Sequence, residues 1–135
     1  MKVYQAGIDI GSTTVKLVVT DEDGRTLFSD YRRHCARTQE TLAALLRDVR
    51  DRLGSCSLRV GMTGSGALAL ADALHVAFEQ EVVAVAEALE AAAPGTDVAI
   101  ELGGEDAKII YFTGGVEERM NLSLIHISEP TRLDV

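Results

Sequence analysis

The spacing of apolar and polar positions changes along the chain, and each change predicts a change of secondary structure. Residues 3–10 and 14–20 are mostly apolar or β-branched, and a third such stretch runs from Arg25 to about Arg33. The turns between them are short, and Asp23-Gly24 is a strong hairpin signal. Short connections join antiparallel neighbours, so these stretches predict a meander of three strands.

A helical period replaces this alternation in the next segment. Apolar side chains fall on one helical stripe at Leu42, Leu45, Leu46, Val49 and Leu53. Thr38 or Thr41 is expected to cap the start of this helix, and Gly54 to end it.

Beyond Gly54 strands and helices alternate. We expect a strand over 58–62, helices over about 67–74 and 80–93, and, after Pro94-Gly95, strands over 98–102, 107–112 and 116–121. This βββ-α-β-α-α order followed by a second hairpin predicts an α/β fold with a mixed sheet and helices on its faces. We expect one domain over 1–95 and the start of a second over 96–121.

Composition limits the functions open to such a fold. The formal charge is −8, and aromatic residues make up 4% of the chain, with no Trp. Lys and Arg are therefore too few to neutralise the phosphates of a nucleic acid or an anionic membrane, and no base-stacking platform is expected. No apolar run reaches the ~18 residues of a membrane span. We expect a cytoplasmic protein with no nucleic-acid or membrane partner.

Two stretches, 7–16 and 99–108, share one pattern. Each has a strand, a carboxylate (Asp9 or Glu101), an apolar residue, a glycine, a small residue and a second strand with a lysine. A glycine-rich turn lets backbone N–H groups approach phosphate, and hydroxyls and a lysine add donors. Asp9 could hold a hydrated Mg²⁺, and Glu101 could orient water or metal. The donors of the first hairpin are Gly11, Ser12, Thr13, Thr14 and Lys16.

Each copy alone is also the signature of a plain turn between strands. Two copies around a complete βββ-α-β-α-α unit favour a nucleotide whose phosphates are gripped from both sides. No G-x-x-x-x-G-K-[ST] motif occurs in the chain, so a P-loop fold is excluded.

These segments resemble the phosphate 1 and phosphate 2 motifs of the actin-like ATPase superfamily. More narrowly, residues 7–16, 63–66 and 101–108 resemble the activators of 2-hydroxyacyl-CoA dehydratases and the ATPase subunits of benzoyl-CoA reductase. The likeness is greatest to the N-terminal module of the long multidomain members and covers 1–121. It implies a ribonuclease-H-like first domain, with the duplicate of that domain beginning near residue 96.

In that family, ATP hydrolysis closes a homodimer around a [4Fe-4S] cluster and sends an electron to an acyl-CoA dehydratase or reductase component. The resemblance implies catalytic roles for Asp9, Glu101 and Glu105, with Asp9 serving Mg²⁺. The shorter activators commonly have Asp and Gln where this chain has Glu101 and Glu105. The resemblance therefore leaves open whether ATP is hydrolysed here. The implied nucleotide-binding residues are Gly11, Ser12, Thr13, Thr14, Lys16, Gly64, Gly66, Gly103, Gly104 and Lys108. Residues 63–66 are expected at the connection between the two halves.

The last segment, 122–135, resembles the translation of a sequencing-library adapter and is left out of the predicted fold. On this interpretation the cluster-ligating cysteine and most of the second domain are missing, and the fragment alone is not expected to be catalytically competent. Cys35 and Cys56 match neither a disulfide scaffold nor a cluster run. The histidines are expected to be surface or packing residues: His34, His75 and His126.

Two other functions stay open. One is a phosphotransferase of the acetate-and-sugar-kinase type, whose catalytic Asp and acceptor pocket would fall largely outside this stretch. The other is a nucleotide-sensing or assembly domain that binds without turnover. The run 105–108 after the double glycine favours the activator group over the kinases.

Overall fold

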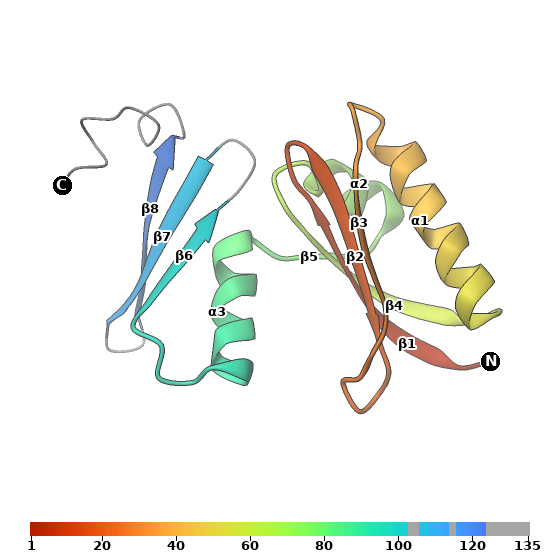
Figure 1. Cartoon of the computed structure of the whole chain (residues 1–135), viewed down its shortest axis with the longest axis horizontal. Coiled ribbons are helices and arrows are strands. Elements are labelled where there is room, and N and C mark those ends of the chain that lie inside the picture. The colour runs from red at the N-terminus through yellow and green to blue at the C-terminus, as the bar shows by residue number, and fades with distance from the viewer. Residues whose placement is uncertain (103–105, 114–115, 124–135) are drawn as a thin grey trace. The chain divides into compact units, whose positions relative to one another are not determined.

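The computed structural model describes residues 1–102, 106–113 and 116–123. They fall into two compact units, Met1–Gln80 and Glu81–Val135. The third helix, α3, is thereby grouped with the second sheet (Figure 1). The sequence-based domain boundary at residue 95 stays a prediction.

The first unit is built on a mixed sheet of five strands in the order β3-β2-β1-β4-β5. The strands β1, β2 and β3 pair antiparallel, whereas β4 runs parallel to β1 and β5 runs parallel to β4. This confirms the predicted meander and mixed sheet. The bounds are β1 Val3–Ile10, β2 Thr14–Thr20, β3 Thr26–Arg33, β4 Ser57–Thr63 and β5 Ala77–Phe78.

Two helices belong to this unit, α1 (Thr38–Leu53) and α2 (Leu68–Leu74), close to the predicted ranges. The predicted N-cap of α1 is wrong. The cap residue is Arg37, whose side chain makes no capping bond, while the Thr41 hydroxyl donates to the Arg37 carbonyl at 2.7 Å. Gly54 ends the helix as predicted, with φ +76° and its N–H bonded to the Arg50 carbonyl.

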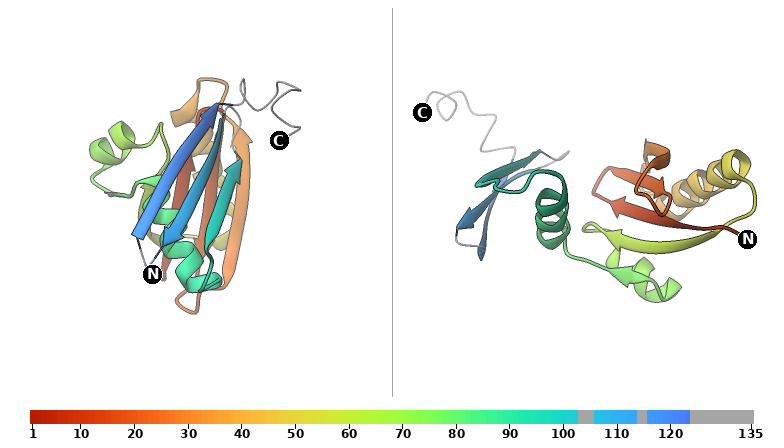
Figure 2. Two further views of the ribbon diagram at one scale, coloured as in Figure 1. Left: turned by 90° about the vertical axis from the view of Figure 1, so that its left-hand side faces the viewer. Right: turned by 90° about the horizontal axis from the view of Figure 1, so that it is seen from below.

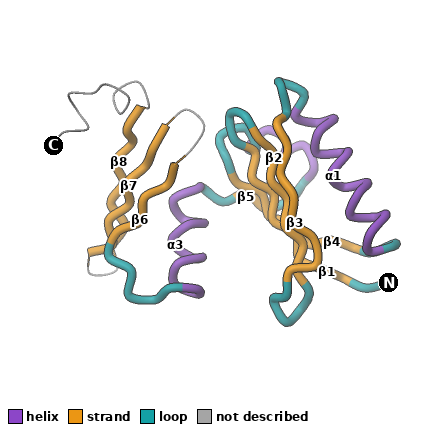
Figure 3. The backbone as a smooth tube through the Cα atoms, viewed as in Figure 1, coloured by secondary structure: helices purple, strands orange, loops and turns teal. Residues whose placement is uncertain are grey.

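The core lies on one face of the sheet, because alternate residues of each strand point to the same side. On β1 the buried residues are Ala6, Ile8 and Ile10, and on β2 they are Val15, Leu17 and Val19. Helix α1 contributes Leu42, Leu45 and Val49 to the same cluster, as its apolar stripe predicts. Figure 3 shows α1 running beside the antiparallel strands. Asp9 and Lys16 therefore point to the other face.

Arg32 links β3 to α1. Its guanidinium pairs with Asp48 of the helix and, at 3.1 Å, with Asp30 of its own strand. The hydrogen bond to Asp48 is the main cause that raises the pKa of Arg32 above its ordinary value. Because these side chains are 35–47% exposed, solvent screens the pair and its contribution to stability is small.

The second unit contains α3 (Glu81–Ala92) and an antiparallel sheet of β6 (Val98–Leu102), β7 (Asp106–Thr113) and β8 (Val116–Ser123) (Figure 2). These elements match the predicted helix and hairpins. The last strand continues two residues past Asn121 into the segment set aside as adapter-like. The rest of that segment, 124–135, lies outside the described residues.

Candidate functional site

The carboxyl ends of three strands meet at one edge of the first sheet. Strand β4 is parallel to β1, and β3 also points the same way as β1 because both pair antiparallel with β2. The residues that follow these strands are therefore neighbours: Gly11 after β1, His34 after β3 and Gly64 after β4. Ligand sites of open α/β sheets lie at such carboxyl ends. We call this the Asp9 edge, after the carboxylate near the end of β1.

Asp9 lies directly opposite Lys16 in the β1–β2 ladder. The Oδ2 atom of Asp9 is 3.8 Å from Nζ of Lys16, and the two side chains are 35% and 57% exposed. The Oδ1 atom of Asp9 is buried. Because this ion pair is long and exposed, it contributes little to stability. The flexible Lys16 side chain can therefore turn toward an anion that approaches this edge.

The loop after β4 packs against the end of β1. Gly64 has φ +106°, and a Cβ placed on it would lie 2.2 Å from the Ile10 carbonyl oxygen and 2.7 Å from Oδ1 of Asp9. The Gly66 N–H donates to the same Ile10 carbonyl at 3.0 Å. Residues 63–66 lie inside the first unit, and Gly64 is beside Asp9. Their position at the connection between the two halves stays a prediction.

The loop after β1 is closed by a hydrogen bond from the Gly11 N–H to the Thr14 carbonyl at 2.9 Å. Within the part of the chain that the structure describes, no hydrogen bond engages the N–H groups of Ser12 or Thr13. Successive N–H groups in such a turn form a concavity suited to an anion. The hydroxyls of Ser12, Thr13 and Thr14 lie on the same loop.

His34 also belongs to this edge. The ring atom Nε2 of His34 lies 3.0 Å from the Gly11 carbonyl oxygen. The backbone N–H of His34 donates to the Thr13 carbonyl at 3.0 Å. The sequence gives no local signal for this role, since the ring and the loop are 23 residues apart. Only the strand order, which sets the end of β3 near the end of β1, brings them together.

The second unit repeats the pairing of the first. Glu101 lies opposite Lys108 in the β6–β7 ladder, as Asp9 lies opposite Lys16 in the β1–β2 ladder. The internal repeat seen in the sequence therefore extends to the register of the strands. The other predicted residues of this hairpin lie outside the described residues: Gly103, Gly104 and Glu105.

The donor set at the Asp9 edge fits Mg²⁺ better than a cluster. Mg²⁺ usually keeps several waters and takes one or two carboxylates plus phosphate oxygens, so Asp9 with a bound phosphate suffices. Among the described residues, no three His, Cys, Asp or Glu side chains gather as metal ligands. Cys35 follows β3 and Cys56 precedes β4, which puts them at opposite edges of the sheet, so they do not fit a shared [4Fe-4S] cluster.

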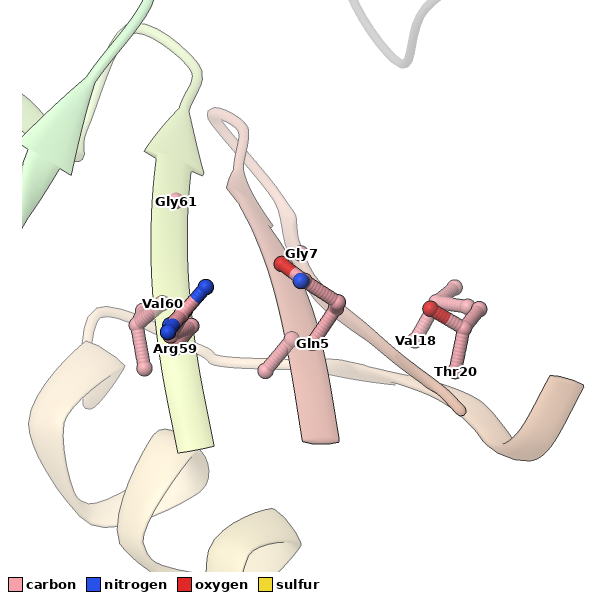
Figure 4. Close-up of a pocket in the computed structure, with 8 residues that line it drawn as sticks. Gln5, Gly7, Val18, Thr20, Arg59, Val60 and Gly61 are labelled. Atoms are coloured by element: carbon pink, nitrogen blue, oxygen red, sulfur yellow. The ribbon is translucent and has the colours of Figure 1, made fainter. Parts of the chain in front are cut away.

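A hollow of about 500 Å³ lies on the same face of the sheet as Asp9, nearer its other edge (Figure 4). It lies over Gly7 and Gly61, which pair directly across β1 and β4, and Arg59 is the charged residue in its lining. None of the residues predicted from the sequence lines it.

In the described part of the chain, no helix is long and apolar enough to cross a membrane.

Comparison with known proteins gives one family and one fold. The model of the family DEDD_Tnp_IS110, described as transposase, matches residues 6–108. This is not the family expected from the motifs. No curated protein sequence matches the chain.

Several solved structures share the fold. Component A of (R)-2-hydroxyglutaryl-CoA dehydratase from Acidaminococcus fermentans has a TM-score of 0.73 at 19% identity, over 90% of this chain and 48% of that chain. The activator of the 2-hydroxyisocaproyl-CoA dehydratase from Clostridium difficile, with bound ADPNP, has a TM-score of 0.73 at 22% identity. The match covers 89% of this chain and 46% of that chain. An exopolyphosphatase from Cytophaga hutchinsonii has a TM-score of 0.60 at 18% identity. The match covers 97% of this chain and 52% of that chain.

The chain thus spans about half the length of these structures. At such identities the likeness shows the fold alone, and that fold is the α/β fold of actin-like ATPases and ribonuclease-H-like domains, as predicted.

Proposed function

This chain belongs to the transposase family DEDD_Tnp_IS110, and we propose that its Asp9 edge binds Mg²⁺ and the phosphates of a nucleoside triphosphate. The observation that carries the proposal is the loop between β1 and β2. The N–H groups of Ser12 and Thr13 belong to the same hairpin as Asp9 and Lys16. Donors for an anion and a carboxylate for a cation are what a metal–triphosphate complex requires.

The choice of a nucleotide over DNA rests on charge and loop size. With a formal charge of −8, the chain has no excess of cations to replace the counterions of a nucleic acid. The loop 11–14 is a tight turn that matches a single phosphate group. A solved structure of the same fold is an activator with bound ADPNP, which also supports a nucleotide.

Each residue of the first hairpin has a role in the proposal. Asp9 would hold Mg²⁺ through water, and the ion would supply positive charge against the phosphates. The N–H groups and hydroxyls of residues 11–14 bind one phosphate, and Lys16 leaves Asp9 to contact another. Gly64 packs against Ile10 and Asp9, and Gly66 packs against Ile10 and Gly11.

The second hairpin enters the proposal on its sequence pattern and its strand register. Glu101, Gly103, Gly104 and Lys108 would form the second phosphate loop, with Glu101 and Glu105 orienting water for hydrolysis. The whole protein of which this chain would be a part would then be an ATPase that activates an acyl-CoA dehydratase or reductase, as the names of two structures of this fold suggest. A homodimer or a fused paired module, and a [4Fe-4S] cluster, would belong to that whole protein. The described cysteines, Cys35 and Cys56, do not fit such a cluster.

The test is a calorimetric titration of the full chain with Mg-ATP. We expect saturable binding that falls at least about tenfold in Asp9→Asn, because a charge-assisted interaction with the metal is lost. Asp23→Asn is the matched control, since it removes the same charge from the exposed turn at the opposite edge of the sheet. Absence of binding by the wild-type chain, or equal binding by Asp9→Asn, would contradict the proposal.

A second function is favoured by the family match: transfer or cleavage of DNA phosphodiesters. It also needs a metal-bound carboxylate, for which Asp9 serves equally. Fluorescence anisotropy with duplex and single-stranded DNA, at two salt concentrations and with Mg²⁺, separates the two. Tight, salt-sensitive DNA binding and Asp9-dependent cleavage, without ATP binding, would replace the nucleotide proposal.

A further inference from the structure

Both ring nitrogens of His34 are engaged in the structure. The Ala36 N–H donates to Nδ1 at 3.1 Å, so Nδ1 is the acceptor of the neutral ring and Nε2 carries the proton. Nε2–H then donates to the Gly11 carbonyl at 3.0 Å. The ring is half-buried, and its orientation is set from both sides.

The turn that carries His34 is itself an unfavourable one. Cys35 and Ala36 have φ +48° and +63°, in the left-handed region that residues with a Cβ rarely adopt. The turn is closed by the Arg37 N–H, which donates to the His34 carbonyl at 2.6 Å. Strain of this kind persists where surrounding contacts hold it, and here the bonds of His34 to the loop 11–14 are among those contacts.

These bonds fix the orientation of a peptide unit. In a planar trans peptide the C=O of Gly11 and the N–H of Ser12 point in opposite directions. The ring that holds the Gly11 carbonyl therefore also directs the Ser12 N–H away from itself. The backbone N–H of His34 restrains the next part of the loop through the Thr13 carbonyl. Without these bonds, the freedom of glycine would let the Gly11–Ser12 peptide rotate.

We propose that His34 is a positioning residue for phosphate: it locks the Gly11–Ser12 peptide so that the Ser12 N–H stays available to the anion. This inference rests on the proposed nucleotide site and assigns its preorganisation to a residue outside the two hairpins. Donors fixed before binding cost no ordering when the ligand arrives, so loss of the lock weakens binding.

The experiment compares His34→Gln with His34→Asn in the full chain. The amide nitrogen of Gln reaches about as far as Nε2 and can still donate to the Gly11 carbonyl. The amide oxygen of Asn lies where Nδ1 does and can accept from Ala36, but its side chain is too short for Gly11. His75→Asn is the control, at the exposed left-handed C-cap of α2.

We expect His34→Asn to weaken Mg-ATP binding about fivefold to tenfold, the loss of about one hydrogen bond, while His34→Gln and His75→Asn stay close to wild type. Without ligand, the amide resonance of Ser12 should move in His34→Asn and not in His34→Gln. Equal affinity in all variants, or equal loss in Asn and Gln, would overturn the inference. If the wild-type chain binds no nucleotide, the proposed function fails, whereas an unmoved Ser12 resonance refutes the lock itself.

Discussion

At the scale of single residues, two glycines at the Asp9 edge differ in what they do. Gly64 is required by the chain itself, because its φ is +106° and the space of its Cβ is taken by the Ile10 carbonyl at 2.2 Å. At Gly11 a Cβ would meet the Thr14 carbonyl oxygen at 3.8 Å and Thr14 Oγ1 at 4.0 Å, both ordinary contacts. Gly64 therefore serves the fold, whereas the fold does not require a glycine at position 11, where the proposed phosphate site would use it.

We predict that Gly64→Ala destabilises the first unit by about 2–4 kcal/mol, since the obstructing atoms are backbone and the residue has positive φ. Urea unfolding followed by circular dichroism measures this. Gly61→Ala is the control: nothing lies within 4 Å of its Cβ position, and a change within about 1 kcal/mol is expected. Equal effects of the two substitutions would show that the β4–α2 loop moves to accept a Cβ.

The candidate site divides into a part that local sequence predicts and a part that it does not. Asp9, Gly11 and Lys16 lie on one hairpin, so the two-residue alternation and the short turn between strands already bring them together. The contacts of His34 with Gly11 and of Gly64 with Ile10 join separate segments. They depend on strand order and register, which no local pattern specifies.

At the scale of elements, α1 is the helix that closes the core. Its stripe could be predicted because Leu42, Leu45 and Val49 recur at helical spacing, and all three are buried. Strand β5 cannot be predicted from the sequence pattern, because Ala77 and Phe78 are too few to display a period. The predicted N-cap of α1 is wrong because the Thr41 hydroxyl lies inside the first turn and donates to the Arg37 carbonyl.

From this packing we predict that Leu45→Ala lowers the free energy of unfolding of the first unit by about 2–5 kcal/mol. Leu45 is 0% exposed beneath the antiparallel strands, so truncation leaves a cavity. Leu68→Ala is the matched control, because Leu68 begins α2 and is 60% exposed, and its effect should stay within about 0.5 kcal/mol. Chemical denaturation measures both, and a loss below 1 kcal/mol for Leu45→Ala would mean that α1 is not held to the sheet through this residue.

At the scale of the whole molecule, the acidic charge and a phosphate site are compatible. The formal charge of −8 acts over the whole surface, whereas the loop 11–14 presents backbone N–H groups at short range. A single small anion meets the local donors, while a long polyanion would meet the acidic surface as well. This contrast is why the nucleotide is the first ligand to test and DNA the second.

Because the chain divides into two units, we predict that residues 1–80 fold alone. The hydrophobic cluster runs from Ala6 to Ala71 within the first unit, and none of the described residues of the second unit belongs to it. Removing 81–135 should therefore expose little of this core. We expect the fragment to unfold cooperatively in urea, within about 1 kcal/mol of the corresponding transition in the full chain.

Binding by the same fragment tests the second hairpin. If Glu101 and the glycine turn after it take part in the site, the fragment should bind Mg-ATP more weakly than the full chain but still respond to Asp9→Asn. Equal affinity would remove the second hairpin from the proposed site and leave the first intact. A fragment without a cooperative transition would instead mean that the second unit completes the core of the first, contrary to the burial of Ile10, Leu17 and Leu45 within it.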